Sequence, residues 1–472
     1  MPAMTPNPVP VCRLTSMRYA MNLLNIVLLV CCGLLPWYSG AAVAASDKEC
    51  IKEPIFKGSV CTVQANRAAR VGVILIHGLG GSTDDWAKTI PALSANFHVV
   101  AFDLPGFGQS DKGSQDYSPT RYAHLVQYLA DRYLQNKPYH VAGHSMGGAI
   151  ALRYAAQRPL GLQRLVLIDA AGILHPQVFT KYQAGSMMER ASGVQQTRGF
   201  IERLSGKLLE QAERLPISAI DIANNALGRD LVLQGGPHQI AALALAGEDF
   251  GAAISAVTAP TLILWGDHDL IAPLRTGRVL AANMMHARME VIYDAGHEPM
   301  LEQAERLNTL LYSYLSASNA VVTDYFNTAP IALAFASERK GRCSGESGKV
   351  FEGDYRSIEL LDCSNISIRN ARVGRLKAVN SRLSLSDTDI LGGEVGLQAE
   401  NSDITLTNGE ISGGIAIKAA GSRIDAAGVR LRGTHAAVRG VNSKLVFSVS
   451  QVNSPQSSGH LHAYKNMADG EF

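Results

Sequence analysis

The fold of this chain is decided by one stretch, YHVAGHSMGGAIALRYAAQ, residues 139–157. Its first four residues predict a buried strand, and Met146 to Gln157 has the pattern of a helix. The G-x-S-x-G pattern at the turn between them places glycines two residues before and after Ser145, where a tight turn crowds the backbone. We therefore expect Ser145 to project from a sharp corner at the carboxyl end of a sheet, as a nucleophile requires.

The chain around this stretch alternates short apolar runs with amphipathic segments, which predicts an α/β fold with a doubly wound, mostly parallel sheet. Continuous apolar runs are typical of strands that are buried on both faces. The predicted strands are Val71–Ile76, His98–Phe102, Tyr139–Ala142, Arg164–Ile168, Thr261–Trp265 and Met289–Tyr293. The predicted helices include Thr120–Leu134, Met146–Gln157 and Pro299–Ser316. These elements assign residues 46–318 to one domain.

A glycine-rich turn, HGLGG at residues 77–81, follows the first buried strand. Glycines at this place let a backbone N–H point into a site, and we expect the N–H groups of Leu79 and Met146 to form an oxyanion hole. A turn without a chemical role is the alternative. The segment DLPGFGQS, residues 103–110, is interpreted as a structural loop that shapes the site and contributes no catalytic group.

A carboxylate is expected after a later strand, where the segment WGDHD, residues 265–269, offers two. Asp269 is favoured because the loop has turned back toward the sheet at that point. Asp267 and Asp169 remain alternatives, Asp169 because it ends the preceding predicted strand.

His297 follows the last predicted strand and is the expected general base. The other histidines have structural explanations. His140 lies within a strand and is expected in the core, and the side chain of His144 is expected to point away from the serine. His268, His286 and the C-terminal histidines are expected on the surface.

The roles follow from proton transfer. Serine is a poor nucleophile at its own pKa, so His297 must take the proton of Ser145 during attack. Asp269 would hold the imidazole in one tautomer and stabilise the imidazolium. Water would then hydrolyse the covalent acyl-enzyme through the same groups.

The glycine-rich turn, the segment 103–110, the G-x-S-x-G turn, the WGDHD segment and His297 follow one another in this order along the chain. Together they resemble the α/β-hydrolase superfamily over roughly residues 70–318. The resemblance implies hydrolysis of carboxylic esters as the commonest activity, with no cofactor. We also expect no metal site. It is nearest to the lid-bearing group that includes esterases, lipases, carbon–carbon bond hydrolases and haloperoxidases. Serine at the nucleophile position argues against dehalogenases and epoxide hydrolases, which use aspartate. Few residues precede the first strong strand, so the first hairpin of the sheet is expected to be short.

Residues 171–259 break the alternation of strands and helices. They contain no strand-like run, only helical segments such as Gly199–Ala212. A structureless loop of this length is implausible within a compact domain. We predict a helical insertion that forms a lid over the site.

The first 45 residues have the pattern of a signal peptide. Arg13 and Arg18 precede an apolar run from Leu23 to Pro36, and small residues follow at 42–45. The run is shorter than the roughly 20 residues of a membrane-spanning helix. An uncleaved N-terminal anchor is the alternative. We expect an exported protein that is periplasmic, on the cell surface or secreted.

A repeat begins beyond residue 319, with successive units roughly 20 residues apart. Each unit has alternating apolar residues and a glycine-containing turn. One unit cannot bury its apolar face alone, so stacked coils of a right-handed parallel β-helix are predicted. The resemblance to β-helix proteins is one of architecture only. The units start at Cys363, Asn380, Asn401, Gly421 and Asn442. The assignment is a linker at 319–342, the repeat domain at 343–455 and a C-terminal tail at 456–472.

Four cysteines lie outside the expected signal peptide: Cys50, Cys61, Cys343 and Cys363. They form two sequence-local pairs, as expected for a compartment that favours disulfides. Four buried free thiols are the alternative. Cys343 and Cys363 lie one repeat apart, so we predict that a disulfide joins equivalent positions of the first two coils.

The 43 Lys and Arg and the 41 Asp and Glu give a net charge of +2, which excludes a strong field that would attract nucleic acid. We therefore predict an exported serine esterase or lipase that acts on a small-molecule or lipid ester. A carbon–carbon bond hydrolase is the alternative, in which Arg190, Arg198 and Arg203 would bind an acidic substrate. An adhesion protein is the alternative from another class, with a vestigial hydrolase and a β-helix that contacts polysaccharide or the cell surface. Asp387 and Asp389 are a weak indication of polysaccharide chemistry.

Overall fold

The computed structural model describes residues 48–135, 137–178, 226–231, 233, 235–318 and 337–472. The expected signal peptide, most of the expected lid with its three arginines, and most of the expected linker lie outside these residues. Among the helices of the described residues, none is long and apolar enough to cross a membrane.

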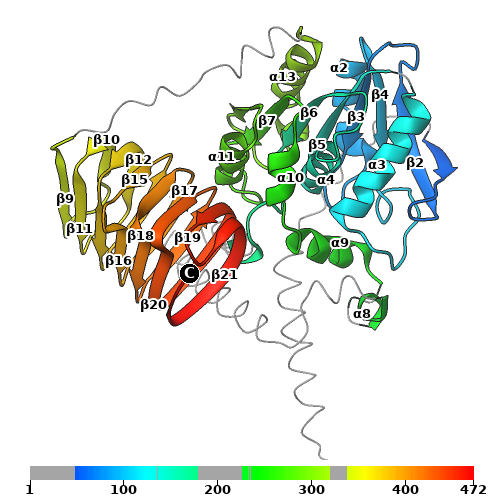
Figure 1. Ribbon diagram of the computed structural model, residues 1–472. Helices are drawn as coiled ribbons and strands as arrows, with labels where there is room; N and C mark the ends of the chain where they lie inside the picture. Colours follow the sequence, from blue (N-terminus) through cyan, green and yellow to red (C-terminus); the bar gives the residue numbers. More distant parts are fainter. Residues whose placement is uncertain (1–47, 136, 179–225, 232, 234, 319–336) are drawn as a thin grey trace, which may run out of the picture.

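An eight-stranded sheet forms the centre of the N-terminal domain (Figure 1), in the order β1-β2-β4-β3-β5-β6-β7-β8. The strands are β1 (Glu49–Lys52), β2 (Ser59–Ala65), β3 (Gly72–Ile76), β4 (His98–Phe102), β5 (Tyr139–His144), β6 (Leu162–Ile168), β7 (Thr261–Gly266) and β8 (Ala287–Ile292). The strands from β3 to β8 pair in parallel, whereas β2 pairs antiparallel with β1 and β4. The prediction of an α/β fold with a mostly parallel sheet is confirmed, and β1 is short, as expected.

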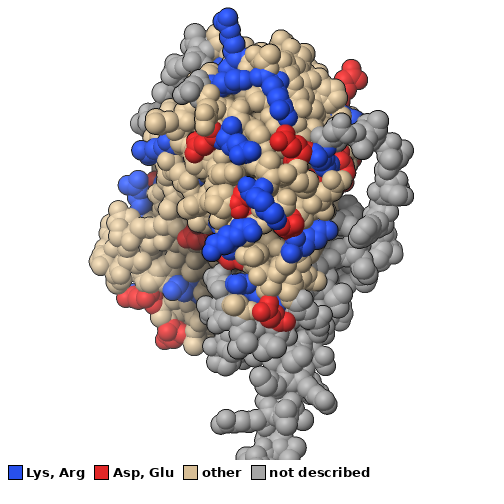
Figure 2. Space-filling view, turned by 90° about the vertical axis from the view of Figure 1, so that its right-hand side faces the viewer, with Lys and Arg blue, Asp and Glu red and all other residues tan. Residues whose placement is uncertain are grey.

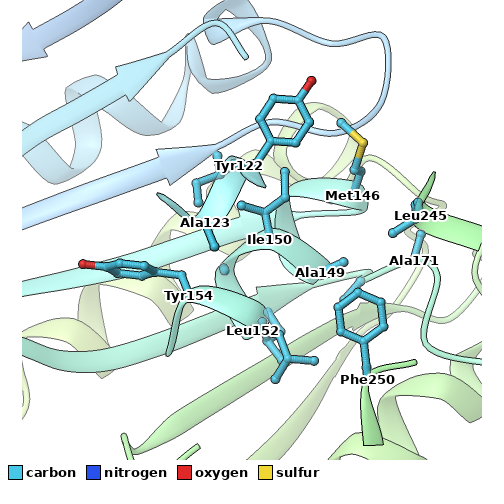
Figure 3. Packing of buried hydrophobic residues seen from close by; sticks show 14 of the residues in the cluster. Tyr122, Ala123, Met146, Ala149, Ile150, Leu152, Tyr154, Ala171, Leu245 and Phe250 are labelled. Carbon is cyan, nitrogen blue, oxygen red and sulfur yellow. The ribbon is translucent and has the colours of Figure 1, made fainter. Parts of the chain in front are cut away.

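Helices cover both faces of this sheet. Successive residues of a strand point to opposite faces, and β3 places Ile74 and Ile76 in one buried cluster and Val73 and Leu75 in another. The first cluster includes residues of α3 (Pro119–Tyr133), α4 (Met146–Ala155) and α11 (Leu274–Asn283). The second includes residues of α2 (Thr89–Ser94) and α13 (Ala304–Ser316). Figure 3 shows the α4 side chains packed among those of α3 and Phe250.

The described residues of the expected insertion contain helices joined by irregular segments, and no strand. Its described helices are α8 (Ala226–Leu231), α9 (Pro237–Ala246) and α10 (Gly251–Ala256). The segment Gly199–Ala212 lies outside the described residues, so a lid over the site stays a prediction.

The C-terminal region is all-β, and its strands pair mostly in parallel. Its strands are β9 (Lys340–Ser344), β10 (Val350–Tyr355), β11 (Ser357–Leu361), β12 (Ile366–Val373), β13 (Leu376–Val379), β14 (Arg382–Ser386), β15 (Asp389–Leu391), β16 (Val395–Glu400), β17 (Asp403–Thr407), β18 (Glu410–Ala420), β19 (Arg423–Ala427), β20 (Arg430–Asn453) and β21 (Ser458–Glu471). Equivalent residues of the sequence repeat stack in register. Leu383 pairs with Ile404, Ile404 with Ile424, and Ile424 with Leu445. This register agrees with the predicted stacking, while the coiled β-helix itself stays a prediction.

The Asn-Ser or Gly-Ser pair that starts four of the repeats has a structural explanation. Asn380, Asn401, Gly421 and Asn442 all have positive φ, between 45° and 58°, a conformation that asparagine and glycine tolerate best. The serine that follows forms a ladder between units. The backbone N–H groups of residues 381, 402 and 422 each donate to the hydroxyl of the next unit's serine, at 3.1, 3.1 and 3.2 Å. The corner and its ladder therefore explain the repeated Asn-Ser or Gly-Ser.

The expectation of an irregular tail at residues 456–472 is wrong. Strand β21 occupies most of this segment and pairs antiparallel with β20. The sequence of this strand is mainly polar, so it lacks the alternation that marks the other strands. Its pairing instead satisfies the backbone groups that an open sheet edge would leave unpaired. The repeat region also begins earlier than residue 343, with β9.

Both predicted disulfides are present, Cys50–Cys61 and Cys343–Cys363. Cys50 lies directly opposite Cys61 in the β1–β2 pair. The reason given for the second pair is wrong, because the register sets Cys343 beside Leu360 and not beside Cys363. The cysteines still reach one another, with their Cα atoms 6.4 Å apart, within the range of about 4.4–6.8 Å that a disulfide accepts.

The two domains share buried residues and a partly buried ion pair. Ala427, Val446 and Val449 belong to the same apolar cluster as α3 and α4. Arg275 of α11 donates to both carboxylate oxygens of Asp425, at 2.8 and 3.0 Å. The last strands of the repeat region therefore pack against the N-terminal domain (Figure 1).

Charges on the face of the molecule seen in Figure 2 are mixed in sign. Lysine and arginine side chains lie beside aspartate and glutamate, as expected from the near-neutral net charge.

The serine ladder predicts that Ser402→Ala lowers the stability of the repeat region. The change leaves the buried N–H of Ser381 without its acceptor, which costs about 1–3 kcal/mol. Thermal unfolding followed by circular dichroism measures the loss. Ser384→Ala is the matched control, because Ser384 is exposed and water replaces its bonds. Equal melting temperatures for the two variants would contradict the ladder.

Candidate active site

Ser145 stands at the corner between β5 and α4, with φ of 52° and ψ of −119°. Residues other than glycine rarely adopt such a backbone conformation, which stores strain. The corner is possible because its neighbours are glycines. A Cβ on Gly143 would collide with the carbonyl oxygen of Gly147, and one on Gly147 would collide with that of Ile76. The expected reason for both glycines therefore holds.

The structure brings Ser145, Asp269 and His297 together, as the sequence predicts. His297 Nε2 lies 2.9 Å from the Ser145 hydroxyl, and His297 Nδ1 lies 2.8 Å from Asp269 Oδ2. With its proton on Nδ1, the imidazole donates to the carboxylate and accepts from the serine. This tautomer poises Nε2 to receive a proton from Ser145.

Backbone donors hold Asp269 in place. Its Oδ1 accepts from the N–H groups of Ile271 and Ala272, at 2.7 and 2.9 Å, so Oδ2 is left for the imidazole. Asp267, the first alternative, accepts instead from the N–H of Ala295, at 3.3 Å. Of these two carboxylates, Asp269 is the one that meets His297.

Asp169, the second alternative, is fully buried near the imidazole and carboxylate pair. Burial and the negative charge of Asp269 raise the pKa of Asp169 well above its usual value. This shift favours the neutral form of Asp169, whose Oδ1 accepts from the N–H of Gly266, at 2.9 Å. Asp169 therefore supports the loop, whereas Asp269 is the carboxylate that contacts His297.

The loops that carry Asp269 and His297 approach closely through two glycines. A Cβ on Gly266 would collide with the carbonyl oxygen of Gly296. Glu302, at the end of α12 (Pro299–Glu302), accepts from the N–H of Gly296 at 2.6 Å and from that of Glu298 at 3.2 Å. The loop around His297 is thus fixed on both sides of the imidazole.

The expectation for His144 is wrong, because its side chain does not point away from the site. His144 Nε2 donates to the backbone carbonyl of His297, at 2.6 Å, and the two rings lie 4.9 Å apart. Burial holds the pKa of His144 well below its usual value, so the ring is neutral. His144 is a positioning residue for His297. His140, by contrast, is buried in β5, as predicted.

The glycine-rich turn at residues 77–81 lies against the serine. A Cβ on Gly78 would come within 3.1 Å of the Ser145 Cβ, so the turn adjoins the serine, while the oxyanion hole of Leu79 and Met146 stays a prediction. His77 anchors the turn. Burial lowers the pKa of His77 to about 4, so its neutral ring donates from Nδ1 to the Gly78 carbonyl and accepts at Nε2 from the N–H of Leu104.

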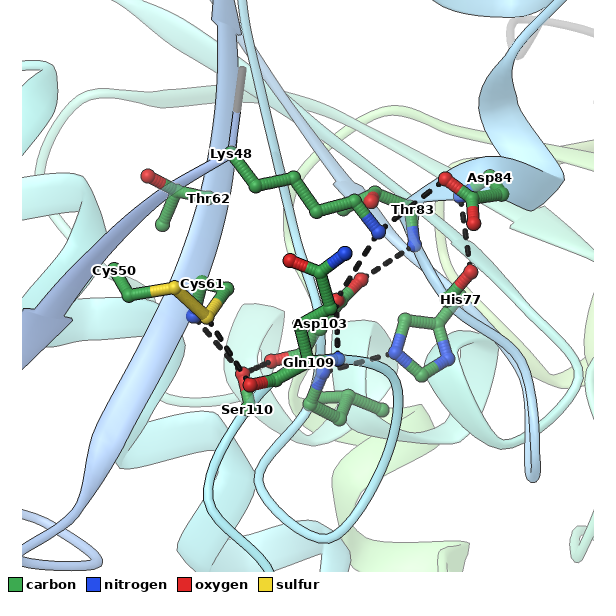
Figure 4. A network of polar contacts seen from close by, with 12 residues as sticks. Lys48, Cys50, Cys61, Thr62, His77, Thr83, Asp84, Asp103, Gln109 and Ser110 are labelled. Carbon is green, nitrogen blue, oxygen red and sulfur yellow. Dashed lines mark hydrogen bonds and ion pairs between the residues drawn. A yellow bond between two sulfur atoms is a disulfide. The ribbon is translucent and has the colours of Figure 1, made fainter. Parts of the chain in front are cut away.

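The segment 103–110 is organised by Asp103, as Figure 4 shows. Its carboxylate accepts from the N–H groups of Thr83 and Gln109, at 2.7 and 2.8 Å, and from Lys48 Nζ, at 3.3 Å. Ser110 donates to the Asp103 carbonyl and accepts from the N–H of Cys61. The network agrees with a structural loop. Sequence reasoning missed Lys48, which carries no local motif.

The described part of the insertion reaches this edge of the sheet. His238 of α9 lies beside Gly80, where a Cβ would come within 3.1 Å of its Nε2, and its ring lies 6.3 Å from that of Phe107. The insertion thus contacts the turns that surround Ser145.

Comparison with known proteins agrees with this geometry. The model of the alpha/beta hydrolase fold family matches residues 72–304. The match supports an α/β-hydrolase fold for these residues. The chain is 26% identical over 266 residues to monoacylglycerol lipase abhd6-B of Xenopus laevis, covering 54% of this chain and 78% of the relative.

Two further proteins show the range of this similarity. A 2-hydroxy-6-oxononadienedioate/2-hydroxy-6-oxononatrienedioate hydrolase of Paraburkholderia xenovorans is 28% identical over 251 residues, covering 52% of this chain and 86% of the relative. The crystal structure of a hydrolase from Pseudomonas aeruginosa PA01 aligns at 22% identity and a TM-score of 0.43, covering 58% of this chain and all of the other.

Asp269 contacts His297, whereas Asp169 has a raised pKa, so replacement by asparagine should have different effects at the two positions. Asp269→Asn should lower kcat/KM for an activated ester by about 10⁴-fold, because an amide favours the wrong tautomer of His297. Asp169→Asn should keep kcat/KM within about fivefold of the wild type, since an amide resembles a neutral acid. A larger loss for Asp169→Asn than for Asp269→Asn would show that the acid is misassigned.

The contact of His144 with the His297 backbone predicts a loss of positioning. His144→Ala should lower kcat by about 10–100-fold with little change in KM, because small displacements of a catalytic group cost up to about 100-fold. Steady-state kinetics on a p-nitrophenyl ester measure the two constants. His124→Ala, at an exposed position of α3, is the control. Unchanged kcat in His144→Ala would remove the positioning role.

Proposed function

We propose that this chain is an exported serine hydrolase that cleaves carboxylic esters through an acyl-enzyme. The observation that carries the proposal is the continuous hydrogen-bonded chain from Ser145 through His297 to Asp269. Each separation lies in the range of a direct hydrogen bond, so a proton can move without rearrangement.

Ser145 attacks the ester carbonyl while His297 Nε2 takes its proton. The carbonyl oxygen becomes an oxyanion, which the backbone N–H groups of Leu79 and Met146 stabilise. Asp269 stabilises the imidazolium, which then gives its proton to the leaving alcohol. A water molecule attacks the acyl-enzyme with His297 as the base, and the acid leaves as Ser145 recovers its proton.

The substrate class rests on the neighbouring proteins. One relative, matched over 78% of its length, is a monoacylglycerol lipase. This similarity supports a lipid or small-molecule ester as the substrate. The described residues and the comparisons give no support for contact with polysaccharide. Asp387 and Asp389 have structural partners, the side chain of Asn408 and the N–H of Glu410.

A carbon–carbon bond hydrolase is the second candidate, and the similarity to the 2-hydroxy-6-oxononadienedioate hydrolase favours it. Such a substrate carries carboxylates, so the insertion would have to supply cations. The arginines suggested for this task lie outside the described residues.

Export is supported by the disulfides. The described residues contain two, one in each domain. Disulfides persist in oxidising compartments and are rare in the cytosol. Together with the signal-like N terminus, they favour a periplasmic, cell-surface or secreted protein.

The proposal predicts that Ser145→Ala and His297→Ala each lower ester hydrolysis by at least about 10³-fold without loss of fold. Hydrolysis of p-nitrophenyl esters of graded chain length measures the rate and the preferred acyl group. Circular dichroism checks the fold, and His124→Ala is the control. Retention of a tenth of the wild-type rate by either variant would overturn the assignment. Turnover of a 2-hydroxy-6-oxo-dienoate but of no ester would favour the second candidate.

A further inference from the structure

A second group of titratable side chains lies where the two domains meet. Asp249 precedes α10 in the N-terminal domain, and His460 and His462 belong to β21 of the C-terminal domain. One ligand atom from each of the three residues lies within 4.8 Å of the others. None of them takes part in the proposed hydrolysis.

The strand presents both imidazoles to the same partner. His460 and His462 are two residues apart on β21, so their side chains share one face of the strand. Contacts between β21 and α10 bring that face to Asp249. A Cβ on Gly251 would collide with the His460 ring, so this glycine permits the imidazole to lie against the α10 backbone.

The separations are within a few tenths of an ångström of those between two ligands of one metal ion. Asp249 Oδ1 lies 3.0 Å from His460 Nε2 and 3.8 Å from His462 Nδ1. Zinc binds imidazole nitrogen and carboxylate oxygen at about 2.0–2.2 Å, so two ligands of a tetrahedral ion are about 3.3–3.5 Å apart. The two observed separations fall on either side of this range.

An unsatisfied nitrogen also points to a ligand. His462 Nδ1 is buried without a hydrogen-bond partner, and its side chain is only 9% exposed. A buried polar atom without a partner is costly, and such atoms are rare in folded proteins. The His175 ring lies 5.2 Å from that of His462 and closes one side of the group. The N–H of Gly251 donates to Asp249 Oδ1, at 2.8 Å, and orients the carboxylate.

We propose that Asp249, His460 and His462 bind one divalent transition-metal ion, Zn²⁺ by the donor set, which joins the last strand to the hydrolase domain. Two imidazoles and one carboxylate are typical zinc ligands, whereas Ca²⁺ and Mg²⁺ prefer oxygen alone. Three protein ligands leave a fourth position for water. A simple ion pair between Asp249 and His460 is the alternative. That ion pair does not explain why His462 lies beside the carboxylate.

Zinc titration of the full chain, after dialysis against a chelator, tests the proposal. Calorimetry should show one Zn²⁺ per chain, and Zn²⁺ should raise the melting temperature. Tetrahedral Co²⁺ gives visible absorption, so Co²⁺ substitution reports the geometry. His462→Ala and Asp249→Asn should each weaken binding at least tenfold and abolish the zinc-dependent rise in melting temperature. Asp249→Asn keeps the size of the side chain, so it is informative if the alanine variant unfolds.

Two control variants distinguish Zn²⁺ binding at this site from Zn²⁺ binding elsewhere on the chain. His124→Ala removes an exposed histidine and should bind Zn²⁺ as the wild type does. His297→Ala disrupts the other described group able to hold a metal, that of Asp169, Asp269 and His297, and should also retain the zinc. Zinc binding that survives in both His462→Ala and Asp249→Asn, or that disappears in His297→Ala, overturns the proposal.

Discussion

The close approach of two backbone segments at Ser145 is the constraint on which the rest of the N-terminal domain depends. At this corner Ser145 has a positive φ, and the chain around it fits only because residues 143 and 147 have no side chain. Once the corner is made, α4 must run back across the sheet, where its apolar residues enter the main cluster. The strain at the serine is thus held by the packing of a whole helix.

The same physical device recurs in the C-terminal region for a structural purpose. Residues with positive φ mark the start of four repeats, at Asn380, Asn401, Gly421 and Asn442. Asparagine and glycine tolerate this conformation locally, whereas the positive φ of Ser145 is imposed by its surroundings. A positive φ therefore has a different cause at Ser145 than at these corners.

The residues of the site could be predicted because the carboxyl ends of parallel strands meet at one edge of the sheet. Ser145, Asp269 and His297 each follow a recognisable strand, so their meeting required no knowledge of contacts. The preference for Asp269 over Asp169 was also possible, but the raised pKa of Asp169 depends on burial, which no motif encodes. His144 was misjudged because its neighbour across the site, the His297 carbonyl, is distant in the sequence.

Predictions in the repeat region succeeded for period and pairing and failed at its ends. Strand β21 follows no repeat and has no apolar alternation, so its pairing, and with it the burial of His462, could not be read from residue types. The Cys343–Cys363 disulfide was found through an incorrect register, because a disulfide accepts a wide range of Cα separations.

The shared core between the domains changes how the repeat region can unfold. Solenoids ordinarily fray from their free ends, where a coil lacks a neighbour. Here the first repeat is cross-linked by a disulfide, and the last is covered by the core of the N-terminal domain through Val446 and Val449. Both ends of the stacked repeats are thereby anchored. The weakest cooperative unit consequently lies in the middle repeats, and hydrogen exchange is expected to be fastest there, far from either anchor.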